Sequence, residues 1–201
     1  MKRTTLALAI LILFSLNSTG LATVVFDENV SGDASTAAAA PTSISVGLGE
    51  NTIIGSVINS NNATVGDRDF FTFTIQPGQL LTGIFQNSFS PTNRGFHAIN
   101  AGSTGIAPSG PGAGDTSQFL GSAHLDPFPA DLNLLPDLGT PLAGIGFTGP
   151  LGAGDYTYVV QQTSNLVSSY SLSFVVEAVP EPSSLVLSGI LFGIAGLRRT
   201  R

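Results

Sequence analysis

The chain of 201 residues contains no cysteine and no tryptophan, and each absence removes a class of function. Without cysteine there is no disulfide, no thiolate metal site and no cysteine nucleophile. Without tryptophan, any aromatic platform for sugar rings has to use tyrosine or phenylalanine. Stability must therefore come from a hydrophobic core, and the roughly 160 residues between the two chain ends suffice for one domain.

Basic residues are scarce outside the chain ends. Residues 23–180 hold twelve acidic residues and only two basic ones, Arg68 and Arg94, which gives this segment a net charge of −10. Such a surface repels a phosphate backbone, so the composition argues against nucleic-acid binding. The other basic residues lie in the first three and last four positions: Lys2, Arg3, Arg198, Arg199 and Arg201. Their position at the two chain ends points to two targeting segments.

The N-terminal end has the order of a secretory signal peptide. Lys2 and Arg3 precede an apolar run at residues 6–16, and Gly20-Leu21-Ala22 supplies the small residues that precede a cleavage site. We therefore predict that residues 1–22 form a signal-peptide helix that is cleaved after Ala22. The implied partners are the secretion translocon and signal peptidase, and residues 23–180 are expected to cross the inner membrane.

The C-terminal end, residues 179–201, joins a stiff segment to a short apolar run and an arginine cluster. Pro180 and Pro182 fix their own φ at about −65° and push the residues before them into extended conformations. Residues 184–197 make about 21 Å of helix against about 30 Å of hydrocarbon, which predicts a short transmembrane anchor. The positive-inside bias places the C-terminus in the cytoplasm, held there by three arginines: Arg198, Arg199 and Arg201.

The order Val-Pro-Glu-Pro-Ser, glycine-rich apolar run and terminal arginines resembles the PEP-CTERM sorting signal of Gram-negative bacteria. The resemblance implies that an exosortase-type membrane transpeptidase recognises Pro180, Glu181 and Pro182 and processes the chain near them. It also implies an inner-membrane precursor that later reaches the cell surface or the extracellular matrix. The alternative is an ordinary C-terminal anchor that happens to follow Pro-Glu-Pro.

Several stretches within residues 44–178 alternate apolar and polar side chains, as strands do, and residues 23–180 show no convincing helical period. Within residues 69–75, Phe71, Phe73 and Ile75 share one face. We predict an all-β fold, an antiparallel and jelly-roll-like β-sandwich over residues 44–178, after a polar leader at 23–43. The expected strands are residues 44–48, 52–59, 69–75, 80–86, 156–161 and 170–176, with turns at 49–51 and 76–79.

Residues 101–154 have a different composition from the strands on either side. They hold 12 of the 24 glycines and 7 of the 12 prolines, a density that opposes regular structure. Side chains such as Phe119, Leu134 and Phe147 are nevertheless too apolar for a solvated linker. We interpret this segment as long ordered loops with short strands, laid over the sandwich.

Three segments, residues 66–78, 151–160 and 170–174, are similar to bacterial pre-peptidase C-terminal domains; the first has the sequence G-D-R-D-F-F-T-F-T-I-Q-P-G. The resemblance implies a jelly-roll sandwich of the kind that is appended to secreted proteins and suspected of binding matrix or carbohydrate. This chain departs from that pattern in its long middle segment.

Few residues are suited to catalysis. The chain has two histidines, His97 and His124, and no G-x-S-x-G elbow. Asp126 stands two residues after His124, which leaves a secreted Ser-His-Asp hydrolase as a third and remote hypothesis. Residues 144–149 match G-x-G-x-x-G, but they follow one proline and run into another instead of joining a strand to a helix. We therefore predict no catalytic residue and no enzyme.

Calcium is the one cofactor that the pattern leaves open. Asp67 and Asp69 alternate onto one strand face, with Asn61 and Asn62 nearby in sequence. Calcium needs about six to eight oxygen ligands, and only two side chains are visibly placed. The alternative interpretation is that Asp67 caps a turn and Asp69 begins a strand beside Arg68, so no metal ligand is assigned from sequence.

The sequence favours an exported, non-enzymatic β-sandwich protein of the cell surface or extracellular matrix. The alternative is a carbohydrate-binding module that acts on the exopolysaccharide matrix. Its platform would have to use Tyr156, Tyr158, Tyr170 or a phenylalanine, and such rings on alternating strands more often belong to the core.

Overall fold

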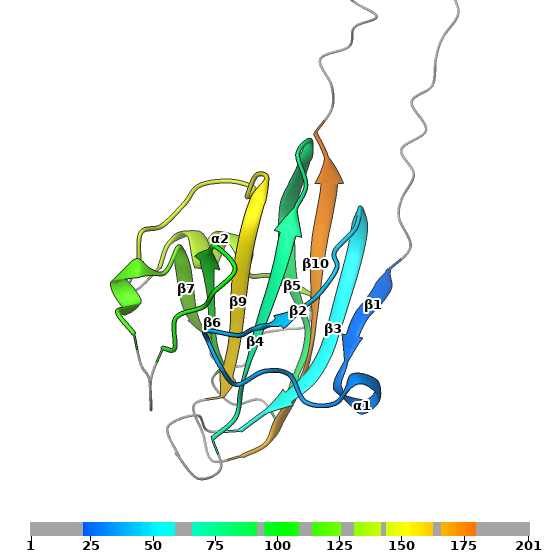
Figure 1. The fold of residues 1–201 in the computed structure, drawn as a ribbon, viewed down its shortest axis with the longest axis vertical. Coiled ribbons are helices and arrows are strands. Elements are labelled where there is room, and N and C mark those ends of the chain that lie inside the picture. Colours follow the sequence, from blue (N-terminus) through cyan, green and yellow to red (C-terminus); the bar gives the residue numbers. More distant parts are fainter. Residues whose placement is uncertain are drawn as a thin grey trace, which may run out of the picture.

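Two five-stranded sheets face each other in the computed structural model, which describes residues 22–58, 66–91, 95–108, 114–125, 131–141, 144–162 and 166–179 (Figure 1). Sheet A has the order β1-β3-β10-β5-β8 and sheet B the order β2-β4-β9-β6-β7. The predicted all-β sandwich is confirmed for this part of the chain. The expected signal-peptide helix and membrane anchor lie outside it, and the described residues include no helix long and apolar enough to cross a membrane.

The elements have the following bounds. Sheet A contains β1 (Thr23–Asp27), β3 (Gly49–Val57), β5 (Gln79–Ser90), β8 (Leu132–Asn133) and β10 (Ser168–Ala178). Sheet B contains β2 (Thr42–Ser43), β4 (Arg68–Ile75), β6 (Gly95–Ala101), β7 (Gly121–Leu125) and β9 (Gly154–Gln162). Three short helices connect them: α1 (Glu28–Ser31), the 3-10 turn η1 (Thr116–Gln118) and α2 (Leu135–Gly139).

The long strands pair in the predicted antiparallel sense, whereas the first two strands pair in parallel, β1 with β3 and β2 with β4. Both come from residues 23–43, the predicted leader, so the sandwich begins at Thr23. The strand expected at 44–48 is wrong. β2 consists of Thr42 and Ser43, followed by one further bond to β4, from the Ile44 N–H to the Thr72 carbonyl at 2.9 Å, and residues 49–51 open β3 instead of forming a turn. β1 was not predicted, because its consecutive apolar residues show no alternation. Phe26 of β1 is nevertheless buried, with its ring edge-on to that of Phe71 and the ring centroids 5.2 Å apart.

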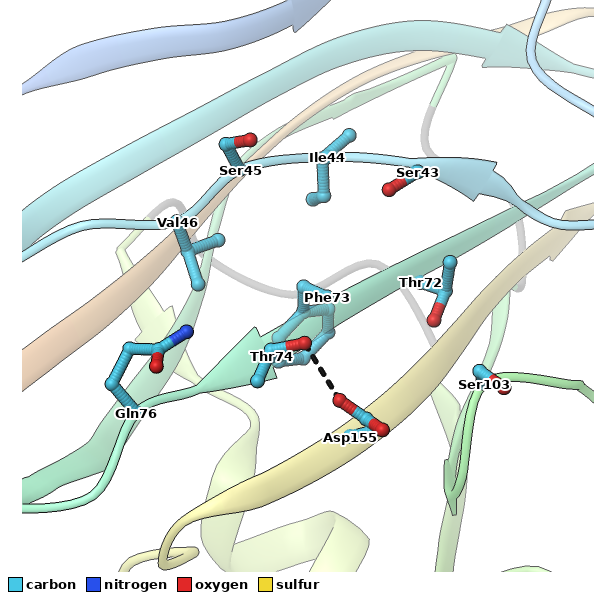
Figure 2. Close-up of a pocket in the computed structure, with 10 residues that line it drawn as sticks. All are labelled: Ser43, Ile44, Ser45, Val46, Thr72, Phe73, Thr74, Gln76, Ser103 and Asp155. Atoms are coloured by element: carbon cyan, nitrogen blue, oxygen red, sulfur yellow. Dashed lines mark hydrogen bonds between the residues drawn. The ribbon is translucent and has the colours of Figure 1, made fainter.

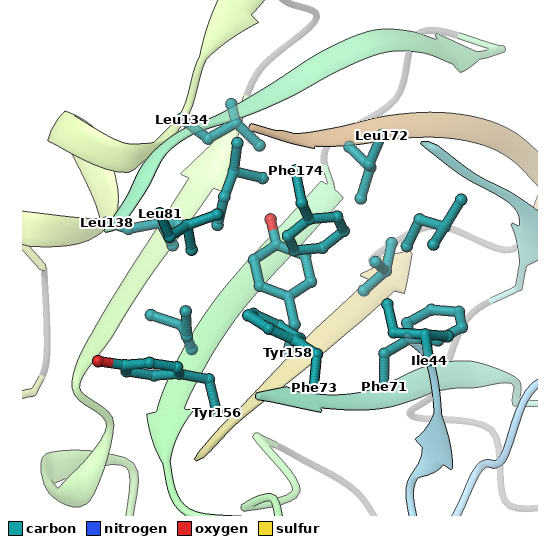
Figure 3. Close-up of a cluster of buried hydrophobic side chains, with 14 of the residues drawn as sticks. Ile44, Phe71, Phe73, Leu81, Leu134, Leu138, Tyr156, Tyr158, Leu172 and Phe174 are labelled. Carbon is teal, nitrogen blue, oxygen red and sulfur yellow. The ribbon is translucent and has the colours of Figure 1, made fainter. Parts of the chain in front are cut away.

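The core lies between the sheets, on the faces that the alternation predicts (Figure 3). Phe73 of sheet B and Phe174 of sheet A pack with their ring centroids 5.1 Å apart, and Tyr158 meets Phe174 at 5.3 Å. Leu138 of α2 joins this core from the middle segment. The predicted core faces are all buried: Phe71, Phe73 and Ile75 of β4, and Tyr170, Leu172, Phe174 and Val176 of β10.

A second apolar cluster covers the outer face of sheet B. Phe70 points away from the core and is still fully buried, because the middle segment lies over it. In the described part of residues 101–154 the chain forms loops together with the short strands β7 and β8, and β6 was not predicted. The cluster consists of Phe70, Phe96, Ala98, Ala107, Phe119 and Val159.

The described chain begins and ends at the same end of sheet A, the upper end in Figure 1. Thr23 pairs with Asn51, which in turn pairs with Phe174, and β10 continues from there to Ala178. We call this the terminal end. The helix α1 lies at the opposite end, beyond the last residue of β1.

Candidate metal centre and sorting signal

Four carboxyl groups gather at the end of the sandwich opposite the terminal end. Glu28 of α1, Asp33 of the turn after it and Asp69 of β4 offer oxygen atoms that all lie within 4.8 Å of one another. Asp67 stands just before β4. Burial raises the pKa of Asp67 to about 6, and the negative charges of Asp33 and Glu28 add to that rise, so Asp67 interacts with the same group. We call Glu28, Asp33, Asp67 and Asp69 the acidic cluster.

Local structure directs Glu28 and Asp33 toward β4. Asp27 ends β1 and caps α1, because its carboxylate accepts a hydrogen bond from the Asn29 N–H at 2.9 Å. Gly32 ends α1 with a φ of 82°, a value that favours glycine. The change of chain direction at Gly32 places Asp33 near Glu28 and Asp69. Two hydrogen bonds connect Glu28 to β3: its Oε2 accepts one from the Ser56 N–H at 2.7 Å and one from the Ser56 hydroxyl at 3.1 Å.

Asp69 is the buried centre of the cluster, with 0% of its surface exposed. The Tyr170 hydroxyl donates a hydrogen bond to Asp69 Oδ2. Burial, followed by the charges of Glu28 and Asp67, raises the pKa of Asp69 to about 9 despite that bond. A Cβ at Gly55 would lie 2.5 Å from the Tyr170 hydroxyl oxygen and 2.8 Å from Glu28 Oε1, so glycine leaves the room that this arrangement needs.

Three oxygens of the cluster are buried without a hydrogen bond from a neutral or basic group among the described residues: Glu28 Oε1, Asp67 Oδ1 and Asp69 Oδ1. In the absence of a metal, a proton on Asp69 is shared with Glu28. Leaving a buried acceptor unpaired costs about 1–3 kcal/mol, and like charges add to that cost. A cation removes both penalties. Oxygens bound to one calcium ion at about 2.3–2.6 Å lie at most about 5 Å apart, so the spacing of Glu28, Asp33 and Asp69, within 4.8 Å, fits. An all-carboxylate donor set favours a hard cation such as calcium over zinc.

Sequence reasoning found half of this cluster. Asp69 lies in the group with Glu28 and Asp33, and the charge of Asp67 acts on Asp69. Asp69 is the second residue of β4, close to the expected strand start beside Arg68, and it is buried. Glu28 and Asp33 were missed because they lie in the segment predicted as a leader. The run D-E-N-V-S-G-D at residues 27–33, rich in oxygen ligands and ending in a glycine turn, was the available signal. Asn61 and Asn62 lie outside the described residues.

The two histidines occupy different environments. His97 of β6 is fully buried, and its Nδ1 forms a hydrogen bond with the Tyr158 hydroxyl at 2.9 Å. Burial lowers the pKa of His97 to about 3, which keeps the ring neutral and closed off from any substrate. His124 of β7 is exposed, with its ring 4.9 Å from that of Phe96. Asp126, its partner in the hydrolase hypothesis, lies outside the described residues.

A polar pocket of about 360 Å³ opens where the chain after β2 leaves β4 (Figure 2). At its centre the Thr74 hydroxyl donates to Asp155 Oδ1 at 2.6 Å. Hydroxyl groups and one amide make up most of the remaining wall: Ser43, Ser45, Thr72, Gln76 and Ser103.

The pocket contains no tyrosine. Tyr156, Tyr158 and Tyr170 are 8%, 0% and 1% exposed, respectively. As the alternation indicated, these rings belong to the interior, so none of them offers a face on which a sugar could stack.

The C-terminal residues are assigned by comparison with known families. Residues 178–199 match the family model of the PEP-CTERM protein-sorting motif. This segment is a PEP-CTERM sorting motif. It supports exosortase-dependent sorting, and it implies export and membrane anchoring through the C-terminal region. Its residues from Pro180 onward, including Glu181, Pro182 and the terminal arginines, lie outside the described structure.

Among solved structures, the chain is similar to the pre-peptidase C-terminal domain of a collagenase from Bacillus anthracis. The TM-score is 0.35 at 14% identity, and the similarity covers 68% of this chain and 97% of that domain. No curated protein matches the chain. The ectodomain is therefore interpreted from its own geometry.

Proposed function

We propose that this chain is an exported, non-enzymatic protein of the cell surface or extracellular matrix, sorted by an exosortase-type transpeptidase and stabilised by calcium. The observation that carries the proposal is a PEP-CTERM sorting motif joined directly to a folded β-sandwich. The closed environment of His97 supports a role without catalysis, because a general base has to reach its substrate.

In the proposed route, signal peptidase cleaves after Ala22 and the apolar run at 184–197 holds a precursor in the inner membrane. The cytoplasmic stop is Arg198, Arg199 and Arg201. The transpeptidase recognises the extended segment Pro180-Glu181-Pro182, processes the chain near it, and so transfers the sandwich from the membrane to the cell surface or matrix. Two prolines separated by one residue suit this role, because they present a stiff backbone to a cleft.

The sorting step is tested with the variant Pro180→Ala/Pro182→Ala in native cells. Export should stay intact while the full-length precursor accumulates in the inner membrane, as seen by intact mass and C-terminal sequencing of membrane and extracellular fractions. Pro150→Ala, at an exposed position in the middle segment, is the matched control and should be processed normally. Normal release of the double variant would show that Pro-Glu-Pro is not the recognition element.

Calcium is proposed as a structural ligand of the acidic cluster. Glu28, Asp33 and Asp69 would hold it, with the charge of Asp67 acting beside them, and its chemistry would be to neutralise carboxylates that otherwise repel one another. Because Glu28 and Asp33 belong to the N-terminal segment while Asp67 and Asp69 belong to the start of β4, binding fastens β1 and α1 to the rest of the sandwich. This site supplies stability in a chain that has no disulfide.

Calcium binding is tested by titration calorimetry and thermal unfolding of the exported segment in calcium and in chelator. At a calcium concentration about 100 times the dissociation constant, binding adds about 2.7 kcal/mol, which raises the melting temperature by roughly 5–10 °C. Asp33→Asn should abolish the shift, and because Asp33 is exposed the variant should still fold. Asp137→Asn on α2, also exposed, is the matched control. Equal melting of the unmodified protein in calcium and chelator would reject the site.

Carbohydrate binding is the second candidate function, and the polar pocket beside β2 is the observation that favours it. Its hydroxyl, amide and carboxylate groups match the hydrogen-bonding groups of a neutral sugar. A glycan array that includes matrix oligosaccharides should then show binding that Thr74→Val/Asp155→Asn weakens and Tyr156→Phe leaves unchanged. No binding by the folded protein would remove this candidate.

A further inference from the structure

The folded sandwich reaches into the sorting motif without a spacer. The matched motif begins at residue 178, and Ala178 is still paired with Gln79 in sheet A. One residue further, the Val179 N–H donates to the Gly78 carbonyl at 2.8 Å. Two residues therefore belong to the motif and to the fold, and Pro180 follows the last described backbone hydrogen bond directly.

The last residues of β10 are held from one side only. Pairing with β3 ends at Val176, opposite Gly49, whereas pairing with β5 continues through Glu177 to Ala178. The side chains from Glu177 to Val179 are exposed, and they lie beside the exposed turn at residues 76–78. This part of the terminal end is thus a solvent-facing surface attached to the motif.

Chain length holds this surface close to the membrane. Five residue steps separate Val179 from Ser184, where the apolar run begins, and they span at most about 18 Å. The polar zone of one leaflet takes up about 5–7 Å of that distance, which leaves about 10 Å between the sandwich and the lipid headgroups. Thr23, the first residue after the predicted signal peptide, lies at the same end.

We propose that the terminal end is a docking surface for the membrane enzyme that processes the sorting motif. The proposal rests on the proposed sorting function. An enzyme that works at the membrane on Pro180–Pro182 must meet the turn at 76–78 and the end of β10, because no linker separates them from the motif. The surface offers the acidic Glu177 and the exposed side chain of Val179, so it fits a partner with basic groups around a small apolar contact.

A spacer separates docking from motif recognition. A Gly-Ser insertion of about eight residues between Val179 and Pro180 keeps the motif, anchor, arginines and sandwich, and moves the sandwich up to about 26 Å farther away. The processed fraction in native cells should fall by about tenfold, which corresponds to losing a contact worth about 1.4 kcal/mol. The same insertion between Leu166 and Val167, both exposed, should leave processing unchanged. Equal or faster processing of the Val179–Pro180 insertion would overturn the proposal.

Charge reversal tests the surface itself without moving the motif. Glu177→Arg should reduce processing several-fold at an unchanged melting temperature, while Asp137→Arg on α2 should process normally. Wild-type processing of Glu177→Arg together with wild-type processing of the spacer variant overturns the docking surface. The Pro180→Ala/Pro182→Ala variant distinguishes the sorting proposal from the docking proposal. If this variant accumulates as unprocessed precursor in the inner membrane and the spacer variant does not, the sorting proposal is supported and the docking proposal fails. If the proline variant is itself processed normally, the sorting proposal fails.

Discussion

The two ends of the sandwich carry their chemistry in different ways. At the terminal end, the chain leaves the fold through backbone hydrogen bonds and exposed side chains, directly into a contiguous motif. At the other end, the acidic cluster takes carboxylates from residues 28 and 33 and from residues 67 and 69, and it packs against Tyr170 of β10. Eight residue steps along β10 separate Tyr170 from Ala178, roughly 26 Å.

The comparison shows that the two kinds of site depend on folding to different degrees. The sorting motif is complete in a few consecutive residues, so recognition of the motif itself does not require the fold, whereas the proposed docking at the terminal end does. The acidic cluster exists only while β1, α1 and β4 are in place, because burial and proximity create its properties. Damage to the fold should therefore abolish the proposed calcium binding, whereas damage to the motif should leave the ectodomain stable.

Truncation should give the largest contrast between the ends. Removing residues 23–33 deletes β1 and half of the acidic cluster, and exposes the core where Phe26 packs against Phe71. Removing one buried aromatic side chain alone costs about 3–5 kcal/mol, so this protein should be mostly unfolded or lose at least that much stability. Removing residues 180–201 should change the free energy of unfolding by less than about 0.5 kcal/mol. Urea denaturation measures both, and a stable, calcium-responsive protein without residues 23–33 would contradict the assignment.

Rising pH should weaken the metal-free protein. Folded Asp69 keeps its proton up to about pH 9, whereas the unfolded chain loses it near the ordinary value of 3.8. The folded state therefore binds more protons in this window, and its stability falls as the pH rises, by a slope approaching about 1 kcal/mol per pH unit. Burial lowers the pKa of His97 from its ordinary value of 6.5 to about 3, so His97 makes the stability rise with pH, and only below about pH 6.5.

Urea denaturation at about pH 7 and about pH 9 in chelator isolates the contribution of Asp69 from that of His97. Saturating calcium should flatten the decline, because the ion favours the ionised carboxylates. A metal-free protein that is equally stable at both values would show that Asp69 is already ionised. Asp69→Asn, which cannot titrate, is the control.

Two buried tyrosines offer a matched comparison of intermediate size. Tyr170 donates to a carboxyl group of the acidic cluster, whereas Tyr158 pairs with the neutral His97. In calcium, where Asp69 is ionised, Tyr170→Phe should cost about 1.5–3 kcal/mol and Tyr158→Phe about 0.5–1.5 kcal/mol, because hydrogen bonds to charged groups are stronger. Unfolding free energies of both variants in calcium decide the order. Equal losses would mean that the charge on Asp69 does not strengthen its bond.

The smallest effect is expected from neutralising a carboxylate at the terminal end. Glu177→Gln alters an exposed side chain outside the acidic cluster, so the free energy of unfolding should change by less than about 0.5 kcal/mol. Calcium affinity should also stay the same. A calcium response that weakens as much as in Asp33→Asn would show that binding depends on overall charge and not on the cluster.

Alternation predicted the strands in which it is long and uninterrupted. β4 and β10 have the predicted core faces, with Phe71 and Phe174 among their buried members. β1 was not predicted because Val24-Val25-Phe26 does not alternate with polar residues. β6 was not predicted because it is buried on both faces, and the sequence pattern does not show that the middle segment covers its outer face. The glycine- and proline-rich composition of residues 101–154 agrees with the short strands β7 and β8 in the part of that segment that the structure describes.

The sequence by itself determined the sorting motif, the absence of disulfides and the all-β class, because each depends on residue types or on spacing along one stretch of chain. Only the tertiary structure decided that the predicted leader is part of the sandwich, that His97 is a neutral core residue, and that Glu28 and Asp33 meet Asp67 and Asp69. The physical reason is that burial and the approach of like charges depend on which distant segments pack together. Neither quantity exists in the sequence until the sheets have formed.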